Sequence, residues 1–273
     1  MEKLIITAAI TGSRITRARA PYIPITPEEI VQSAFECWQS GAAVVHIHVR
    51  DPHTGQGTQK LELFRQVVEP LREKTDLILC LTTSGIPGRN LPVDDRLAPL
   101  ELMPALASFD AGSINLGDSV FINSPEFLQA AAAKMKDMGI KPELEIFDLG
   151  MITTCLRFRD EGRLDEPLHF QFVLGTPWGA PASPKSLLLL HESIPPSSTW
   201  SAIGIGKTHL PMAMMALLLG GHIRVGMEDN IYYSRGVLAQ TNAQFVERIV
   251  RIAQEYGREV ATPADARGIL GVG

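Results

Sequence analysis

The sequence predicts a (β/α)8 barrel built from residues 1–273 as one domain. Short apolar runs rich in β-branched residues alternate with amphipathic helical stretches along the whole chain. Such alternation implies parallel strands joined by right-handed helical crossovers. Eight strand–helix units can be counted, and the chain has the usual length of this barrel. An open, doubly wound sheet is the alternative architecture for the same alternation.

The expected elements follow one another without a linker or a repeat. The first helix is opened by Thr26, a suitable N-cap, with Pro27 at the first helical position and two acids near the positive helix end. The strands are expected at 4–9, 43–49, 77–82, 111–116, 143–147, 170–174, 200–205 and 223–227. Helices are expected near 61–74, 94–107, 125–138, 152–160, 211–220 and 239–256, with one more starting over 184–190. The Pro- and Gly-containing tail after Thr262 is expected on the surface or at a subunit contact.

Composition excludes several classes of protein. The formal net charge is -5 and no run of Lys or Arg stands out, so we expect no nucleic-acid partner. The amino terminus passes directly into a strand-like run, so we expect no signal peptide, and the most apolar helical stretch is too short to span a bilayer. The three cysteines are far apart, with no CxxC pair, which suits buried thiols in a reducing cytoplasm.

Two histidines at the end of the second strand suggest a metal site. His46 and His48 are two residues apart, so their side chains point to the same face of the strand, while Val45 and Ile47 point toward the surrounding helices. Two imidazoles at the carboxyl end of a barrel strand form half of a zinc site, where barrel enzymes place their chemistry. The alternative is a pair of core histidines that bond to their neighbours.

The end of the eighth strand supplies the missing ligand. Glu228 can complete a set of two histidines and one carboxylate, which leaves coordination positions open for water or substrate. Asp229 and Arg224 are close enough to pair, and an aspartate beside an arginine is expected to have a lowered pKa. Asp229 can still accept a proton that a metal has acidified. The alternative is an acidic surface turn with an ordinary salt bridge.

Three further strand ends carry candidate binding residues. Thr82 and Ser84 offer hydroxyls that can hold a carboxylate or an oxyanion, although the same segment can be a helix-capping turn. Lys207 follows the seventh strand, in a Gly-Lys-Thr segment that lacks the first glycine of a P-loop, and is a candidate partner for a phosphorylated cofactor. Arg14 follows the first strand and suits an anionic substrate tail, or it is a solvated loop residue.

These segments together resemble the β-keto acid cleavage enzymes, a family whose named type acts on 3-keto-5-aminohexanoate. The resemblance spans nearly the whole chain in the expected order. It rests most on His46-Ile47-His48-Val49-Arg50-Asp51 and Arg224-Val225-Gly226-Met227-Glu228-Asp229-Asn230, with support from Thr82-Thr83-Ser84-Gly85 and Lys141-Pro142-Glu143-Leu144-Glu145.

The resemblance implies a single catalytic barrel domain with zinc on His46, His48 and Glu228. It implies a reaction in which a β-keto acid and acetyl-CoA become acetoacetate and a new acyl-CoA. Asp229, oriented by Arg224, is the implied base. Glu143 is implied to be near the metal or the substrate, and the family suggests a homotetramer.

One departure from the family concerns Arg14. Members that act on an amino-bearing substrate are expected to place an acid near this position, and an arginine disfavours a cationic tail. We therefore expect an anionic or neutral β-keto acid as the substrate. Two other functions remain as alternatives: a metal-dependent barrel hydrolase or C–C lyase that does not use coenzyme A, and a non-enzymatic zinc- or ligand-binding protein. Manganese or cobalt can also occupy such a site.

Overall fold

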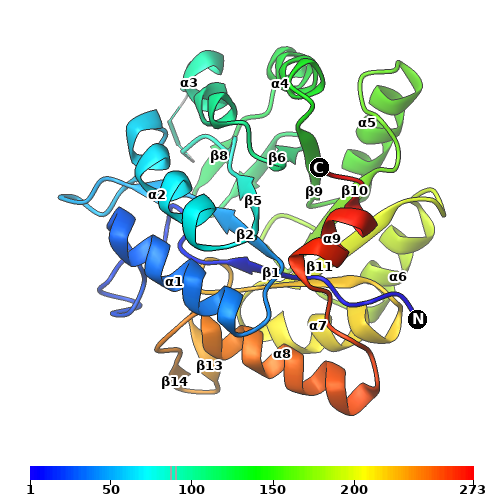
Figure 1. The fold of residues 1–273 in the computed structure, drawn as a ribbon. Helices are drawn as coiled ribbons and strands as arrows, with labels where there is room; N and C mark the ends of the chain where they lie inside the picture. The colour runs from blue at the N-terminus through cyan, green and yellow to red at the C-terminus, as the bar shows by residue number, and fades with distance from the viewer. Residues whose placement is uncertain (87, 90) are drawn as a thin grey trace.

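The computed structural model describes residues 1–86, 88–89 and 91–273, and its centre is a closed parallel barrel. Figure 1 looks down this barrel, in which the strands pair in the order β1-β12-β11-β10-β9-β6-β5-β2. Their bounds are β1 Ile6–Ala9, β2 Val44–Ile47, β5 Ile78–Leu81, β6 Leu106–Asp110, β9 Lys141–Ile146, β10 His169–Leu174, β11 Thr199–Gly204 and β12 His222–Val225. The predicted (β/α)8 barrel is confirmed.

The helices surround the barrel as Figure 1 shows. They are α1 Pro27–Gln39, α2 Leu61–Lys74, α3 Val93–Leu97, α4 Pro125–Asp137, α5 Leu149–Asp160, α6 Pro184–Glu192, α7 His209–Leu218, α8 Ala243–Tyr256 and α9 Pro263–Leu270, with 3-10 turns η1 Ala98–Leu102 and η2 Gly206–Thr208. In the described ranges, three short hairpins lie outside the barrel: β3 Val49–Arg50 with β4 Gly57–Thr58, β7 Ile114–Leu116 with β8 Ser119–Phe121, and β13 Tyr232–Ser234 with β14 Val237–Leu238.

Local sequence signals account for the first two helices. Thr26 accepts a hydrogen bond from the Glu29 N–H, and the Glu29 carboxylate accepts from the Thr26 N–H, so the expected cap is a full capping box. Helix α2 has the predicted bounds and buries one stripe, which includes Phe64, Val67 and Leu71. These side chains pack in the main core with the outward-facing strand residues Val45 and Ile47, as the alternation predicted.

The fourth barrel strand was predicted wrongly. The strand is β6, Leu106–Asp110, whereas the expected 111–116 segment includes β7, which pairs with β8 in the antiparallel hairpin. The preceding helix is shorter than predicted because Met103 adopts a left-handed conformation (φ 50°) and Pro104 follows it. The chain therefore enters the barrel earlier, and Asp110 becomes the strand's last residue.

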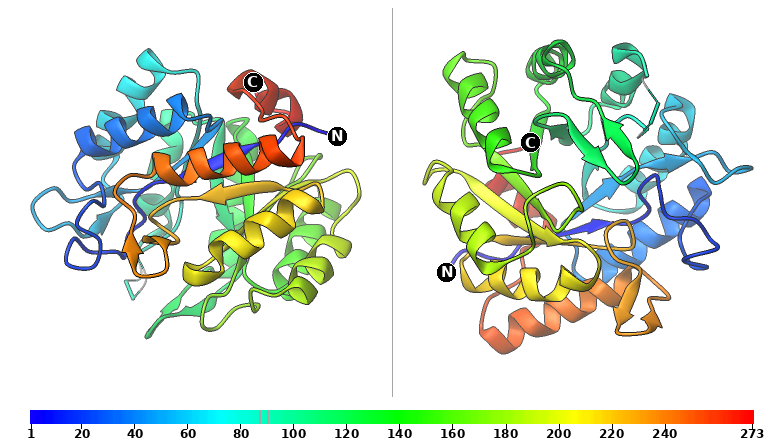
Figure 2. Two further views of the ribbon diagram at one scale, coloured as in Figure 1. Left: turned by 90° about the horizontal axis from the view of Figure 1, so that it is seen from below. Right: turned by 180° about the vertical axis from the view of Figure 1, so that it is seen from behind.

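The tail after Thr262 was also predicted incompletely. It forms α9, whose Ala266 and Leu270 pack against Ile5, Val44 and Ile78 at the amino-terminal end of the barrel. Figure 1 shows α9 crossing in front of the strands, and the left view of Figure 2 shows it at the end of the barrel away from the β13–β14 hairpin. The barrel is therefore closed at this end by apolar side chains, which leaves the opposite end for a site.

Two smaller expectations can be checked directly. Cys37, Cys80 and Cys155 are free and buried, as expected. Within the described ranges, no helix combines the length and apolarity that crossing a membrane requires.

Candidate active site

The ends of β2 and β12 bring His46, His48 and Glu228 together. The Glu228 Oε1 atom lies 3.7 Å from His46 Nε2 and 3.5 Å from His48 Nε2. The ligand atoms of the three residues all lie within 4.8 Å of one another, a spacing that can hold a metal ion. This arrangement of two histidines and one carboxylate matches the predicted ligand set.

The protonation states suit a cation at this point. Burial lowers the pKa of the His46 imidazole well below its usual value, so the ring is neutral and its nitrogens can act as ligands. Burial opposes ionisation of Glu228, but His48 and Arg224 hold its pKa well below the usual value. Among the residues that the structure describes, the buried Glu228 Oε2 finds no hydrogen-bond partner. A divalent metal ion would satisfy this oxygen, so the residues present fit the implied metal.

Glycines make room for this carboxylate. Gly226 has φ 146° and lies so close to the Ala9 carbonyl that any Cβ would clash with it. A Cβ on Gly12 would lie 2.6 Å from Glu228 Cγ. Because both positions lack a side chain, the ends of β1 and β12 can approach closely, and Glu228 lies beside the two histidines.

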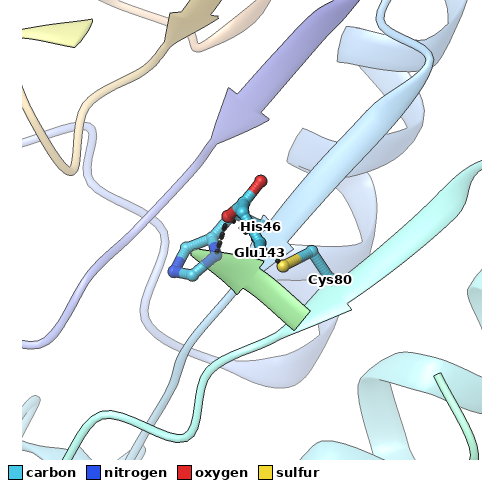
Figure 3. Close-up of side chains that lie close together, drawn as sticks. All are labelled: His46, Cys80 and Glu143. Atoms are coloured by element: carbon cyan, nitrogen blue, oxygen red, sulfur yellow. Dashed lines mark hydrogen bonds and ion pairs between the residues drawn. The ribbon is translucent and has the colours of Figure 1, made fainter. Parts of the chain in front are cut away.

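Cys80 and Glu143 form a second cluster with His46, as Figure 3 shows. The buried Cys80 Sγ donates to Glu143 Oε2 over 3.5 Å, and His46 Nδ1 lies 3.8 Å from the same oxygen. Burial raises the pKa of both Cys80 and Glu143, so the thiol keeps its proton. Cys80 is therefore a hydrogen-bond donor to Glu143 rather than a thiolate ligand, and Glu143 faces the ring nitrogen of His46 that points away from Glu228.

Arg224 joins three carboxylates at the floor of the site. Its Nε donates to Asp229 Oδ2 over 2.9 Å, Nη2 to Glu228 Oε1 over 2.6 Å, and Nη1 to Glu145 Oε1 over 2.9 Å. The predicted Asp229–Arg224 pair is therefore present, and the guanidinium also fixes the candidate ligand Glu228. Glu145 was not predicted as a site residue.

The predicted direction of the Asp229 pKa shift was wrong. The sequence predicted a lowered pKa because of Arg224, but burial outweighs the arginine and raises the pKa of Asp229 to about 6. The nearby Glu228 charge acts in the same direction as burial. An aspartate with a raised pKa is a stronger base than an ordinary one, which is the property expected of a proton acceptor.

The three candidate metal ligands, together with Arg224 and its carboxylate partners, line one cavity of about 560 Å³ at the carboxyl end of the strands. The predicted residues on its wall are His46, His48, Arg224, Glu228, Asp229, Ser84 and Arg14. Asp110 and Glu145 also line it, and the strand register places these two side by side on β6 and β9. Asp110 accepts a hydrogen bond of 2.8 Å from the Ser84 hydroxyl. Sequence reasoning missed Asp110 because it placed the fourth strand at 111–116, so that Asp110 came before the strand and not at its carboxyl end.

Three predicted binding residues do not face the cavity. Thr82 is fully buried, and its hydroxyl accepts from the Ser84 N–H in a local turn. Glu143 is fully buried behind His46, so it does not reach a substrate in the cavity, and Glu145 is the β9 carboxylate that does. Lys207 is exposed and lies outside the cavity wall. For Glu143, strand alternation alone could not predict whether the side chain reaches the cavity, because its depth along the barrel axis also determines whether it contacts a substrate.

Comparison with known proteins agrees with this geometry. Residues 3–272 match the family described as beta-keto acid cleavage enzyme. The chain belongs to this family. It is 44% identical over 272 residues to the 3-keto-5-aminohexanoate cleavage enzyme of Fusobacterium nucleatum, covering 99% of this chain and 98% of that one.

Two other relatives extend the comparison. The chain is 37% identical to the 3-oxoadipate:acetyl-CoA acetyltransferase of Cupriavidus necator, over 98% of this chain and 94% of that one. A solved structure, the binary complex of ObcA with oxaloacetate, has the same fold, with a TM-score of 0.83 at 23% identity, over 94% of this chain and 69% of that chain.

Proposed function

We propose that this protein is a zinc-dependent β-keto acid cleavage enzyme that uses acetyl-CoA as co-substrate. In this reaction a β-keto acid and acetyl-CoA are converted to acetoacetate and a new acyl-CoA. The observation that carries the proposal is the convergence of His46, His48 and Glu228 with the Arg224–Asp229 pair on one cavity wall. The family and the names of its relatives, three of which include acetyl-CoA, support the same reaction class.

His46, His48 and Glu228 would hold the zinc ion. A zinc ion held there would supply Lewis acidity toward the keto oxygen of the substrate and would make the adjacent C–H proton more acidic. Neutral imidazoles and an ionised carboxylate are the forms in which these residues bind a metal. Glu143 would accept a hydrogen bond from His46 Nδ1 and so direct Nε2 toward the metal.

Asp229 is the proposed base. Its carboxylate removes the proton on the carbon between the keto group and the substrate carboxylate, and the resulting carbanion forms a C–C bond with the acetyl carbonyl. The thioester bond breaks, the released coenzyme A thiolate attacks the original keto carbon, and the old C–C bond breaks. The proton on Asp229 then returns to the acetoacetate carbanion, so the base is regenerated. Arg224 holds the carboxylate in place through both transfers.

Polar groups on the cavity wall are proposed to select the substrate. Ser84 reaches the cavity and can hold the substrate carboxylate or the thioester oxygen. Arg14 lines the same cavity and disfavours a cationic tail, so we propose a substrate without an amino group. Lys207 lies outside the cavity, where a phosphate of coenzyme A can reach it. A cytoplasmic homotetramer is proposed from the family resemblance.

The decisive experiment combines metal analysis with a substrate screen. The purified protein is analysed for zinc, and a panel of β-keto acids is tested with and without acetyl-CoA, with acetoacetate detected by mass spectrometry. Acetoacetate that forms only when both substrates are present supports the proposal. Cleavage without acetyl-CoA would replace it with a hydrolase or a C–C lyase.

The matched variant is Asp229→Asn, which keeps the size of the side chain but removes the base. We expect it to retain zinc and to lose about 10²–10⁴-fold in kcat, the usual contribution of a general base. Retained turnover would exclude Asp229 as the base. A non-enzymatic zinc-binding protein would show zinc in both forms and turnover in neither.

A further inference from the structure

Trp178 is an exposed aromatic residue at the mouth of the cavity. It follows β10, and 61% of its surface is exposed, although tryptophan is on average a well-buried residue. Its chain neighbours Thr176 and Pro177 line the cavity, whereas Trp178 itself lies outside the cavity wall. An exposed aromatic ring beside a binding cavity is a candidate contact for a part of the ligand that remains outside.

A tight turn carries this residue. The Gly179 N–H donates to the Thr176 carbonyl over 3.2 Å, and Pro177 occupies the second position of the four-residue turn, which suits its fixed φ. A Cβ on Gly179 would clash with Thr176 Oγ1 and would lie 2.9 Å from the Phe147 carbonyl, so the close packing of this turn requires glycine. Trp178 therefore occupies the third position of a turn that packs directly on the end of the barrel.

A hydrogen bond fixes the orientation of the ring. The indole Nε1 of Trp178 donates to the Gly117 carbonyl over 2.9 Å. Gly117 lies between β7 and β8 and lines the cavity. The nitrogen edge of the indole is therefore bound to a second loop of the mouth, while most of the side chain remains exposed. Because the ring is already held, a planar group that stacks on it would cost the protein little further conformational entropy.

The next loop around the barrel brings a cation to the mouth. Lys207 is exposed and belongs to η2, which follows β11, the strand that pairs with β10. The two loops are in contact, because a Cβ on Gly175 would lie 3.1 Å from Thr208 Oγ1, and the Ile205 N–H donates to the Leu174 carbonyl over 2.9 Å. An aromatic ring and an ammonium group thus lie on neighbouring loops, both outside the cavity wall.

We propose that Trp178 and Lys207 form a subsite for the nucleotide end of coenzyme A, in which the adenine stacks on the indole and a phosphate meets the ammonium group. The inference rests on the proposed function. Coenzyme A carries its thiol at one end of a flexible arm and its adenine and phosphates at the other. The thioester enters a cavity of about 560 Å³, a volume that suits a small ligand, so the nucleotide remains at the mouth. Aromatic stacking and contact with a cation are the interactions that proteins use to bind nucleotides without reading the base.

The first test measures the binding of coenzyme A by calorimetry, without keto acid. Trp178→Leu is expected to weaken binding about five- to hundredfold, the usual contribution of one base stacked on an aromatic side chain. Trp178→Phe keeps a ring but loses the hydrogen bond to Gly117, so it should weaken binding less than Trp178→Leu. Lys207→Ala should also weaken binding, and its effect should shrink at high salt. In turnover, both Trp178→Leu and Lys207→Ala should raise KM for acetyl-CoA but not for acetyl-pantetheine, which lacks the nucleotide.

Fluorescence reports the contact itself, and the chain offers a matched control. Of the three tryptophans, Trp200 is buried, and Trp38 donates its indole hydrogen bond to Asp76 over 2.8 Å, just before β5 at the amino-terminal end of the barrel. Coenzyme A should quench the emission of the wild-type protein, because adenine would lie against Trp178. The quenching should disappear in Trp178→Phe and persist in Trp38→Phe, which also loses an indole hydrogen bond.

Several results would overturn the proposal. Equal weakening by Trp178→Phe and Trp178→Leu would show that the hydrogen bond to Gly117, and not stacking, is what matters. An equal rise in KM for acetyl-CoA and acetyl-pantetheine would show that the ring acts on the acyl end. Unchanged binding in Lys207→Ala would remove the lysine from the subsite. Unchanged binding in Trp178→Leu, with Trp178 emission that varies with protein concentration, would assign the ring to contact with a second copy of this chain.

The binding assays separate this inference from the reaction, because they contain no keto acid. Binding of coenzyme A that depends on Trp178 supports the subsite even when no acetoacetate forms, in which case only the proposed reaction fails. Acetoacetate formation with the same KM for acetyl-CoA in the wild-type and Trp178→Leu proteins supports the reaction and refutes the subsite. A protein that binds no coenzyme A refutes both.

Discussion

Arg50 offers a quantitative test of how the site loop is held. The side chain is 1% exposed, and its guanidinium donates five hydrogen bonds to oxygens only. Four of these oxygens belong to residues 11–15, the loop that carries Arg14, and the fifth is the Gly55 carbonyl. One buried cation therefore fixes the loop after β1 to the end of β3.

The perturbation is Arg50→Lys. A lysine offers three donors from one nitrogen and has no planar fork, so at least two of the five acceptors lose their partner. At about 1–1.5 kcal/mol for each lost bond, the free energy of unfolding should fall by about 2–4 kcal/mol. Urea denaturation measures this loss, and hydrogen exchange of residues 11–25 reports whether the loop itself is released.

Arg258 is the matched control. This residue is buried like Arg50, with 2% of its surface exposed. It donates to carbonyls only, namely those of Glu2, Gly220 and Gly221 at the opposite end of the barrel. Arg258→Lys should cost less free energy, because the three donors of lysine equal its three acceptors, and it should leave exchange of the loop and KM for the keto acid unchanged. A loss below about 0.5 kcal/mol in Arg50→Lys, or an unchanged loop, would show that other contacts hold the loop.

Three further predictions follow from other buried groups. Glu143→Gln should weaken zinc binding about 10–100-fold in a competition assay with a chelator, whereas Cys80→Ala should change it little, because the Glu143 carboxylate, rather than the Cys80 thiol, pairs with His46 Nδ1. Burial lowers the pKa of His209 to about 4, so the fold favours the neutral ring, and the stability is present above the unfolded pKa near 6.5 and lost as the pH falls toward 4. The loss is at most about 3 kcal/mol and should be smaller in His209→Gln, as measured by denaturation across this pH range. Leu270→Ala should lower the free energy of unfolding by about 2–5 kcal/mol, because Leu270 is 1% exposed under the barrel; a cost below about 0.5 kcal/mol would show that α9 is dispensable for stability.

Local patterns were sufficient for much of the fold and the metal ligands. The period of the apolar residues predicted the barrel and the bounds of α2, and Thr26 predicted the N-cap of α1. Alternation along one strand placed His46 and His48 on the same face, and both line the cavity beside Glu228. These features depend on neighbours within a few residues, which is why the sequence could predict them.

Depth in the barrel and pKa depended on the tertiary structure. Glu143 and Glu145 share a face of β9, yet only Glu145 reaches the cavity, because its register partner on β6 is Asp110 at the open end. The pKa of Asp229 is raised because burial outweighs Arg224, a balance that no sequence motif contains. Arg14 lines the cavity because a hairpin about 100 residues later presents a glycine there, so its environment is set by contacts between distant segments.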